Sequence, residues 1–117
     1  MKFAVIVYEK PSEMSARSDP QRQQAYWGSY GAYNQALKDS GVAAGGTALQ
    51  PPDTATTIRL QAGKLHVQDG PYADTKEQLG GMFLIDVKNL DEAIAWAQRC
   101  PAAAHSAVEV RPVLEMA

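Results

Sequence analysis

The segment DGPYADTKEQLGG, residues 69–81, concentrates residue types that could do chemistry, because it carries three carboxylates and a lysine between turn-forming residues. Asp69 stands before a glycine–proline pair, which is typical of a turn. Asp74 and Glu77 have the three-residue spacing of a helix capping box, which explains both by structure alone. Asp69 and Tyr72 remain candidates for a ligand site, since strand ends and loops tend to display functional groups. Alternatively, Asp69 only accepts backbone hydrogen bonds from the turn.

Metal, phosphate and nucleic-acid chemistry find little support in the sequence. His66 and His105 are not placed with Cys or Glu at the spacing of metal ligands, and no glycine–lysine–serine phosphate loop is present. We therefore expect no metal and no cofactor. The only cysteine, Cys100, excludes an intrachain disulfide and fits a reducing cytoplasm. A formal net charge of −2 without a basic stripe argues against nucleic-acid binding, and no segment suits a membrane surface.

Hydrophobic patterns predict the elements that position these residues, and a chain of 117 residues argues for one domain, residues 1–117. The expected order is a strand over 3–8, a helix from Asp19-Pro20 to about Ser40 with Gly41 as its stop, a hairpin made of TTIRLQ and KLHVQD, a strand over 82–87, a helix capped by Asp91, and a final strand in AVEVRPVLEM. In the first helix, Tyr26, Tyr30, Tyr33 and Leu37 recur at offsets of four, three and four, so they share one face. Packing in the core explains three of these four side chains.

The strands over 3–8 and 82–87 are apolar without alternation, which predicts that both of their faces are covered. Two helices can cover only one face of an antiparallel sheet. A second copy of the same chain is the simplest cover for the other face. The sequence therefore predicts a symmetric homodimer with its sheets face to face.

Long stretches of the chain resemble one known family. DGPYADTKEQLGGMFLIDV, LDEAIAWAQRCPAA, VEVRPV and LQPPDTATTIRL together resemble the YCII-related proteins, specifically the subgroup named for a DGPF motif, here written DGPY. The resemblance covers nearly the whole chain. It implies an α+β, ferredoxin-like antiparallel sheet with two helices on one face, which pairs with a second copy into a dimeric α+β barrel.

The resemblance also implies an acid–base site. Typical YCII proteins carry a histidine on the first helix that faces an aspartate, and the histidine position falls near Tyr30 when counted back from Gly41. The aspartate would then be Asp69. A tyrosine, with an ordinary pKa of about 10, is a hydrogen-bond donor or an acid rather than a base at neutral pH.

These assignments lead to an enzyme hypothesis and a binding hypothesis. In the first, Asp69 is the general base, Tyr30 orients or protonates, and an arginine holds an anionic or carbonyl-bearing small molecule during a cofactor-free isomerisation or hydrolysis. The residues expected to bind the ligand are Arg59, Tyr72, Arg111 and Tyr26. In the second hypothesis the same pocket binds without turnover, as a small-molecule sensor or a partner of sigma-factor-type transcription control. Glu109 and Arg111 could instead make only cross-strand or dimer salt bridges.

Overall fold

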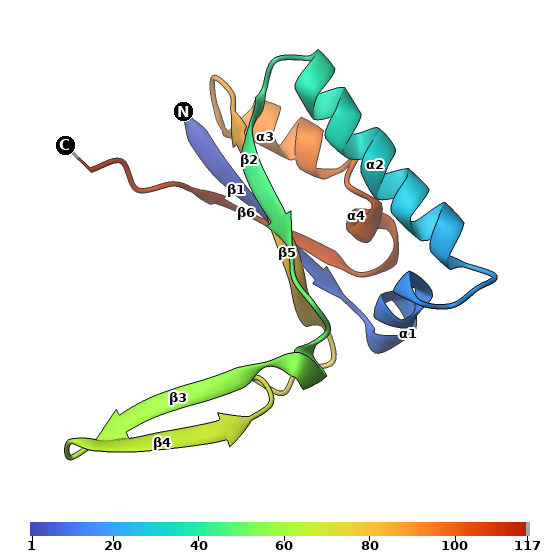
Figure 1. Cartoon of the computed structure of the whole chain (residues 1–117). Coiled ribbons are helices and arrows are strands. Elements are labelled where there is room, and N and C mark those ends of the chain that lie inside the picture. Colours follow the sequence, from blue (N-terminus) through green and yellow to red (C-terminus); the bar gives the residue numbers. More distant parts are fainter. Residues whose placement is uncertain (117) are drawn as a thin grey trace.

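The computed structural model describes residues 1–116. Its centre is a four-stranded antiparallel sheet in the order β2-β5-β1-β6, with α2, α3 and α4 on one face (Figure 1). Strands β3 and β4 form a separate two-stranded sheet. The bounds in chain order are β1 Lys2–Glu9, α1 Pro11–Met14, η1 Ser15–Arg17, α2 Gln23–Asp39, β2 Ala43–Ala48, η2 Pro52–Thr54, β3 Thr56–Gln61, β4 Lys64–Asp69, β5 Gln78–Asp86, α3 Leu90–Ala97, α4 Pro101–His105 and β6 Ala107–Pro112. The expected ferredoxin-like fold is confirmed.

The core lies between the sheet and the helices. Phe3, Val5 and Val7 alternate along β1 toward this side and pack in one buried cluster with Tyr33 and Leu37 of α2. The intervening residues point to the other face, where no helix lies. We call that surface the helix-free face; its apolar residues are Ala4, Ile6, Tyr8, Met82 and Leu84. The single chain therefore covers one face of β1 and β5, and a second copy on the other face remains a prediction.

Helix α2 begins later than its sequence signals indicate. The predicted start at Asp19-Pro20 is wrong, because these residues form a turn before the helix. The side chain of Asp19 accepts from the Gln21 amide at 2.9 Å, and its carbonyl accepts from the Gln23 amide at 2.8 Å. The short helices α1 and η1, which precede this turn, were not expected. The predicted end is confirmed, since Gly41 takes a left-handed φ of +73° just after the helix.

Two predicted helix caps are wrong. Asp74 and Glu77 form no capping box because residues 71–77 contain no helix. The chain there enters β5 directly, and pairing with β1 already begins at Gln78. The capping box lies instead at α3, where the Asn89 side chain accepts from the Glu92 amide at 2.9 Å and the Glu92 carboxylate accepts from the Lys88 amide at 3.0 Å. Asn89, and not Asp91, is thus the cap of that helix.

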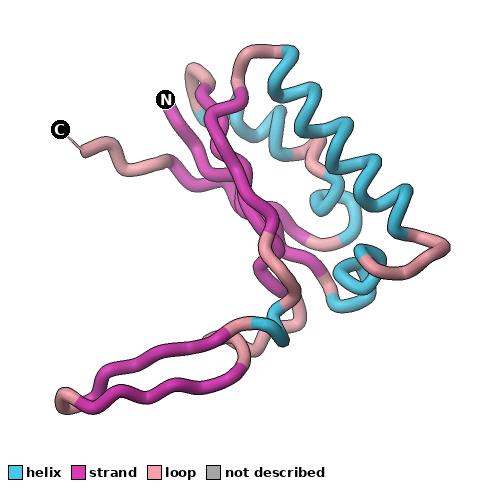
Figure 2. Tube along the Cα trace, in the orientation of Figure 1, coloured by secondary structure: helices cyan, strands magenta, loops and turns pink. Residues whose placement is uncertain are grey.

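The predicted hairpin is confirmed, and it projects from the sheet on the side away from the helices (Figures 1 and 2). Its turn is made by Ala62 and Gly63, which both have positive φ, +51° and +77°, as a two-residue hairpin turn requires. Among residues 1–116, no helix combines the length and the apolar character needed to cross a membrane.

Candidate functional site

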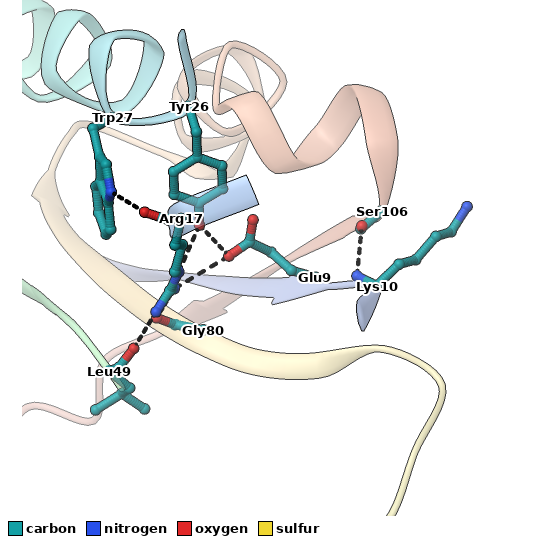
Figure 3. A network of polar contacts seen from close by, with 8 residues as sticks. All are labelled: Glu9, Lys10, Arg17, Tyr26, Trp27, Leu49, Gly80 and Ser106. Carbon is teal, nitrogen blue, oxygen red and sulfur yellow. Dashed lines mark hydrogen bonds and ion pairs between the residues drawn. The ribbon is translucent and has the colours of Figure 1, made fainter. Parts of the chain in front are cut away.

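A buried carboxylate is the centre of the candidate site. Glu9 continues the inward-facing series of Phe3, Val5 and Val7 at the end of β1, and it is 2% exposed. Its Oε1 atom accepts hydrogen bonds from the Tyr26 hydroxyl at 2.6 Å and from Nη2 of Arg17 at 3.2 Å (Figure 3). Within residues 1–116, Glu9 is the only charged residue that is buried.

Arg17 neutralises this carboxylate and is itself held on several sides. Besides Glu9, its guanidinium donates to the Tyr26 hydroxyl at 2.9 Å, to the Gly80 carbonyl at 3.0 Å and to the Leu49 carbonyl. It also lies 5.7 Å and 5.5 Å from the ring centres of Tyr26 and Trp27, within range of cation–π attraction. A buried charge needs both a counter-ion and hydrogen bonds, and this arrangement supplies them.

Gly80 of the opening motif makes room for this ion pair, and Gly81 makes room for the neighbouring strand. A Cβ atom on Gly80 would lie 2.9 Å from Oε1 of Glu9 and 3.1 Å from Nη2 of Arg17. A Cβ atom on Gly81 would lie 2.5 Å from the carbonyl oxygen of Thr47, on the neighbouring strand β2. The residues at these two positions therefore have no space for a side chain.

Tyr30 brings a second polar group to the same region. Its hydroxyl is buried and has no hydrogen-bond partner within the described part of the chain. Its ring lies 5.1 Å from that of Tyr26 and is stacked with Phe83 at 6.5 Å. A buried hydroxyl without a partner is costly, so it is a candidate contact for a ligand.

Tyr30 lines a cavity of about 510 Å³ between α2 and the edge of the sheet formed by β2 and β5. That volume lies in the usual range for small-molecule sites. Other lining residues include Trp27, Asn34, Lys38, Thr47 and Phe83. A second cavity of about 760 Å³ lies between α2 and α4, and Glu9, Tyr26 and Tyr30 line both. Ligand-sized space therefore reaches the buried carboxylate and both tyrosines.

Burial further favours the neutral, protonated form of the tyrosines. It raises the pKa of Tyr26 to about 12, with the hydrogen bond to Glu9 as the next cause. Burial, and then the charge of Glu9, also raises the pKa of Tyr30 well above its ordinary value. Both hydroxyls are therefore protonated at neutral pH and act as hydrogen-bond donors. Burial similarly raises the pKa of the Cys100 thiol to about 11, so that thiol is not a nucleophile at neutral pH.

The structure brings together some of the predicted site residues and separates others. Tyr26 and Tyr30 share one site. Asp69, at the end of β4, is exposed and lines neither of the cavities that Tyr30 lines, so the single chain does not form the expected pair of Asp69 with Tyr30. Arg59 and Tyr72 are also exposed, with the guanidinium 5.8 Å from the tyrosine ring centre.

Arg111 lies on β6 and forms an ion pair with Glu109 at 2.5 Å, while 68% of its side chain is exposed. This ion pair joins two residues of one strand and is therefore not the cross-strand contact considered from the sequence. Arg111 lines neither cavity beside Tyr30.

Glu9 and Arg17 were missed at the sequence level. Glu9 had a usable signal, because a charged residue two positions after Val7 falls on the inward face of an apolar strand. Arg17 had none, since it belongs to the short segment between β1 and α2. In the part of the chain that the structure describes, no three or more His, Cys, Asp or Glu side chains are grouped so that they could hold a metal ion.

Fold and site together define an α+β domain with a small-molecule-sized cavity between its first long helix and its sheet. Residues 1–117 match the YCII-related domain, and the chain belongs to this family. An uncharacterised protein of Rhizobium meliloti (strain 1021) is 36% identical over 115 residues, covering 97% of this chain and 92% of the relative.

A solved structure shares the fold at low sequence identity. It is the 5-chloro-2-hydroxyhydroquinone dehydrochlorinase TftG of Burkholderia phenoliruptrix AC1100, in complex with 2,5-dihydroxybenzoquinone. The TM-score is 0.57 and the identity 17%, with 99% of this chain and 96% of TftG covered.

Proposed function

We propose that the cavity beneath α2 binds a small organic molecule and that Glu9, Tyr26 and Tyr30 hold or transfer a proton on it without a cofactor. The observation that carries this proposal is the buried Tyr30 hydroxyl, which has no partner in the described chain and lines the cavity beside Glu9. A ligand oxygen that accepts from this hydroxyl removes the cost of leaving it unpaired.

The lining indicates the class of ligand. Trp27, Tyr30 and Phe83 offer aromatic surface, while Asn34 and Lys38 add polar contacts. A planar molecule with carbonyl, phenol or enol oxygens suits this combination. The quinone bound by TftG, a protein of the same fold, belongs to this class and supports the assignment.

The site assigns roles to its members. Tyr30 donates a hydrogen bond to the ligand, because its raised pKa makes it a hydrogen-bond donor and a poor acid. Glu9 takes the base role predicted for Asp69, and Arg17 balances its charge. Arg59 and Arg111, which were predicted to hold the ligand, line neither cavity beside Tyr30. Tyr26 holds Glu9 in place. Proton transfer of this kind serves a cofactor-free isomerisation or hydrolysis.

A non-catalytic binding protein, such as a sensor in transcription control, is the second candidate. One observation favours it: Oε1 of Glu9 already accepts hydrogen bonds from Arg17 and Tyr26, so that oxygen is engaged within the chain. In this case the protein would bind a small molecule in the same cavity without converting it.

A ligand screen separates these proposals. Phenols, hydroquinones, quinones and cyclic enols are tested for a rise in melting temperature, and hits are measured by calorimetry on the wild type, Tyr30→Phe and the control Tyr33→Phe. The control is matched because the Tyr33 hydroxyl already donates to the Trp96 carbonyl at 2.9 Å. Equal affinity for the wild type and Tyr30→Phe would remove the basis of the proposed site.

Turnover is tested on the same hits by NMR in deuterated buffer, which detects both product and proton exchange on the ligand. The enzyme proposal expects exchange or product with the wild type and none with Glu9→Gln. Binding without either signal would leave the non-catalytic function.

We also propose that the chain forms the homodimer predicted from its sequence. The support is the helix-free face, whose apolar residues on β1 and β5 have no helix against them (Figure 1). Light scattering at micromolar concentration measures the mass directly, and a monomer there would contradict the proposal.

A further inference from the structure

The β3–β4 hairpin carries an apolar face that nothing in the single chain covers. The register pairs Ile58 with Val67 and Leu60 with Leu65, so these four side chains lie on one face of the ribbon. Their exposed fractions are 64% for Ile58, 60% for Val67, 73% for Leu60 and 63% for Leu65. The opposite face is polar and consists of Thr57, Arg59, Gln61, Lys64, His66 and Gln68.

Such a hairpin requires a partner surface. Two-stranded hairpins alone in water are marginally stable, and contiguous apolar patches on exposed strands typically mark interaction sites. The hairpin has strands of six residues each and extends away from the sheet (Figures 1 and 2). Its one-sided polarity indicates that one face is buried and the other stays in water.

The same chain offers a second uncovered apolar surface, the helix-free face. The hairpin leaves the sheet on the side away from the helices, which is the side of that face (Figure 1). Two surfaces of this kind on one side of a chain are both covered when two copies pair about a two-fold axis. The apolar face takes alternate residues of the two hairpin strands, and these add to the alternate residues of the sheet in one interface between two copies.

The charges of the hairpin argue against a nucleic acid as its partner. The hairpin, residues 56–69, holds two cations, Arg59 and Lys64, against the single anion Asp69. The whole chain has a formal net charge of −2, so the remainder is acidic. Both cations lie on the polar face of the ribbon and Asp69 lies on the side of Ile58 and Leu60, so the face to be covered holds no cation and does not suit a nucleic acid.

We propose that the β3–β4 hairpin is an exchanged arm, which buries Ile58, Leu60, Leu65 and Val67 against a second copy of this chain while the helix-free faces of the two copies pack together. This assigns the hairpin, and not only the sheet, to the interface. It is independent of what the cavity beneath α2 binds.

The test removes the apolar face and keeps the strands. The fourfold variant Ile58→Thr, Leu60→Thr, Leu65→Thr, Val67→Thr places a β-branched residue, which favours strands, at all four positions. The control variant Gln61→Thr, Gln68→Thr changes the polar face of the same strands. Sedimentation and light scattering across a concentration series then give the dimer dissociation constant for each protein.

We expect the wild type and the control variant to be dimers of equal affinity, and the fourfold variant to dissociate at least tenfold more readily. A monomeric wild type would overturn the proposal that the hairpin is an exchanged arm. A fourfold variant that dimerises as tightly as the control would overturn it as well.

Hydrogen exchange of the wild type adds a readout that does not depend on the folding of a variant. If the hairpin is an exchanged arm, the amides of residues 56–69 should exchange more slowly as the protein concentration rises through the dissociation constant of the dimer. Protection independent of concentration would contradict it. Ligand affinity of the Tyr30 cavity, measured separately, shows whether the proposed function fails or holds without the arm.

Discussion

Replacing Tyr30 by phenylalanine removes one oxygen from the site and leaves its aromatic ring, so it isolates the buried hydroxyl. That hydroxyl has no partner within the described chain, and leaving such a group unsatisfied costs about 1–3 kcal/mol. We therefore expect Tyr30→Phe to leave the free energy of unfolding unchanged or to raise it, by at most about 1–3 kcal/mol.

Tyr33→Phe provides the comparison on the same helix. The Tyr33 hydroxyl donates to the Trp96 carbonyl at 2.9 Å, so its removal should lower the free energy of unfolding by about 0.5–1.5 kcal/mol. The two variants lose the same atom and should shift stability in opposite directions. Urea unfolding at pH 7, followed by tryptophan fluorescence, measures both.

Ligand affinity completes the test. Because the proposed ligand accepts a hydrogen bond from Tyr30, its loss should weaken binding by about 0.5–1.5 kcal/mol, roughly 2- to 10-fold in the dissociation constant. A Tyr30→Phe protein destabilised as much as Tyr33→Phe would show that the hydroxyl is already satisfied in the free protein. The reasoning that assigns it to a ligand would then be refuted.

The remaining predictions concern stability and are read by urea unfolding. Gly80→Ala should lower the free energy of unfolding by about 1–3 kcal/mol because its Cβ meets the buried ion pair; Gly28→Ala, where a Cβ meets nothing within 4 Å in a helix, should raise it by about 0.5–1 kcal/mol, and equal effects would contradict the packing. Folding raises the pKa of Tyr26 from 10 to about 12, so the stability that Tyr26 contributes is complete below pH 10 and is lost as the pH rises toward 12. Between pH 10 and 12 the free energy of unfolding should therefore fall less steeply with pH in Tyr26→Phe than in the wild type. The same slope in both proteins would count against the burial of this hydroxyl. Asn89→Ala should cost about 0.5–2 kcal/mol as the loss of a cap, whereas Asp74→Ala should cost close to nothing, and the reverse order would restore the capping box predicted from the sequence.

Local signals in the sequence located most elements of the fold. The hairpin was predictable because strand alternation and the turn residues Ala62 and Gly63 agree, and the end of α2 because Gly41 takes a conformation that favours glycine. The caps were not, because Asp74 and Asn89 are both good cap residues and only the surrounding chain decides which of them precedes a helix. The segment after Asp74 enters β5 and pairs with β1, so no helix forms there.

The candidate site divides in the same way. The spacing placed Tyr26 and Tyr30 on one face of a helix, because residues four apart return to the same side, and the resemblance selected Tyr30 as a site residue. Asp69 was placed with them from the resemblance, whereas the structure holds it on the projecting hairpin. Glu9 lies beside the tyrosines because α2 packs across the end of β1. No spacing in the sequence shows that these two elements meet.

By itself, then, the sequence determined the family, the order of the elements and the helical face that carries the tyrosines, because these depend on periodicity and on contiguous motifs. The tertiary structure decided which carboxylate meets them. Glu9, Arg17, Tyr26 and Gly80 come from four separate segments, and a buried ion pair forms only where packing excludes water and leaves room for it. The uncovered face of the hairpin is likewise a tertiary property, since alternation shows that one face is apolar but not that nothing in the same chain lies against it.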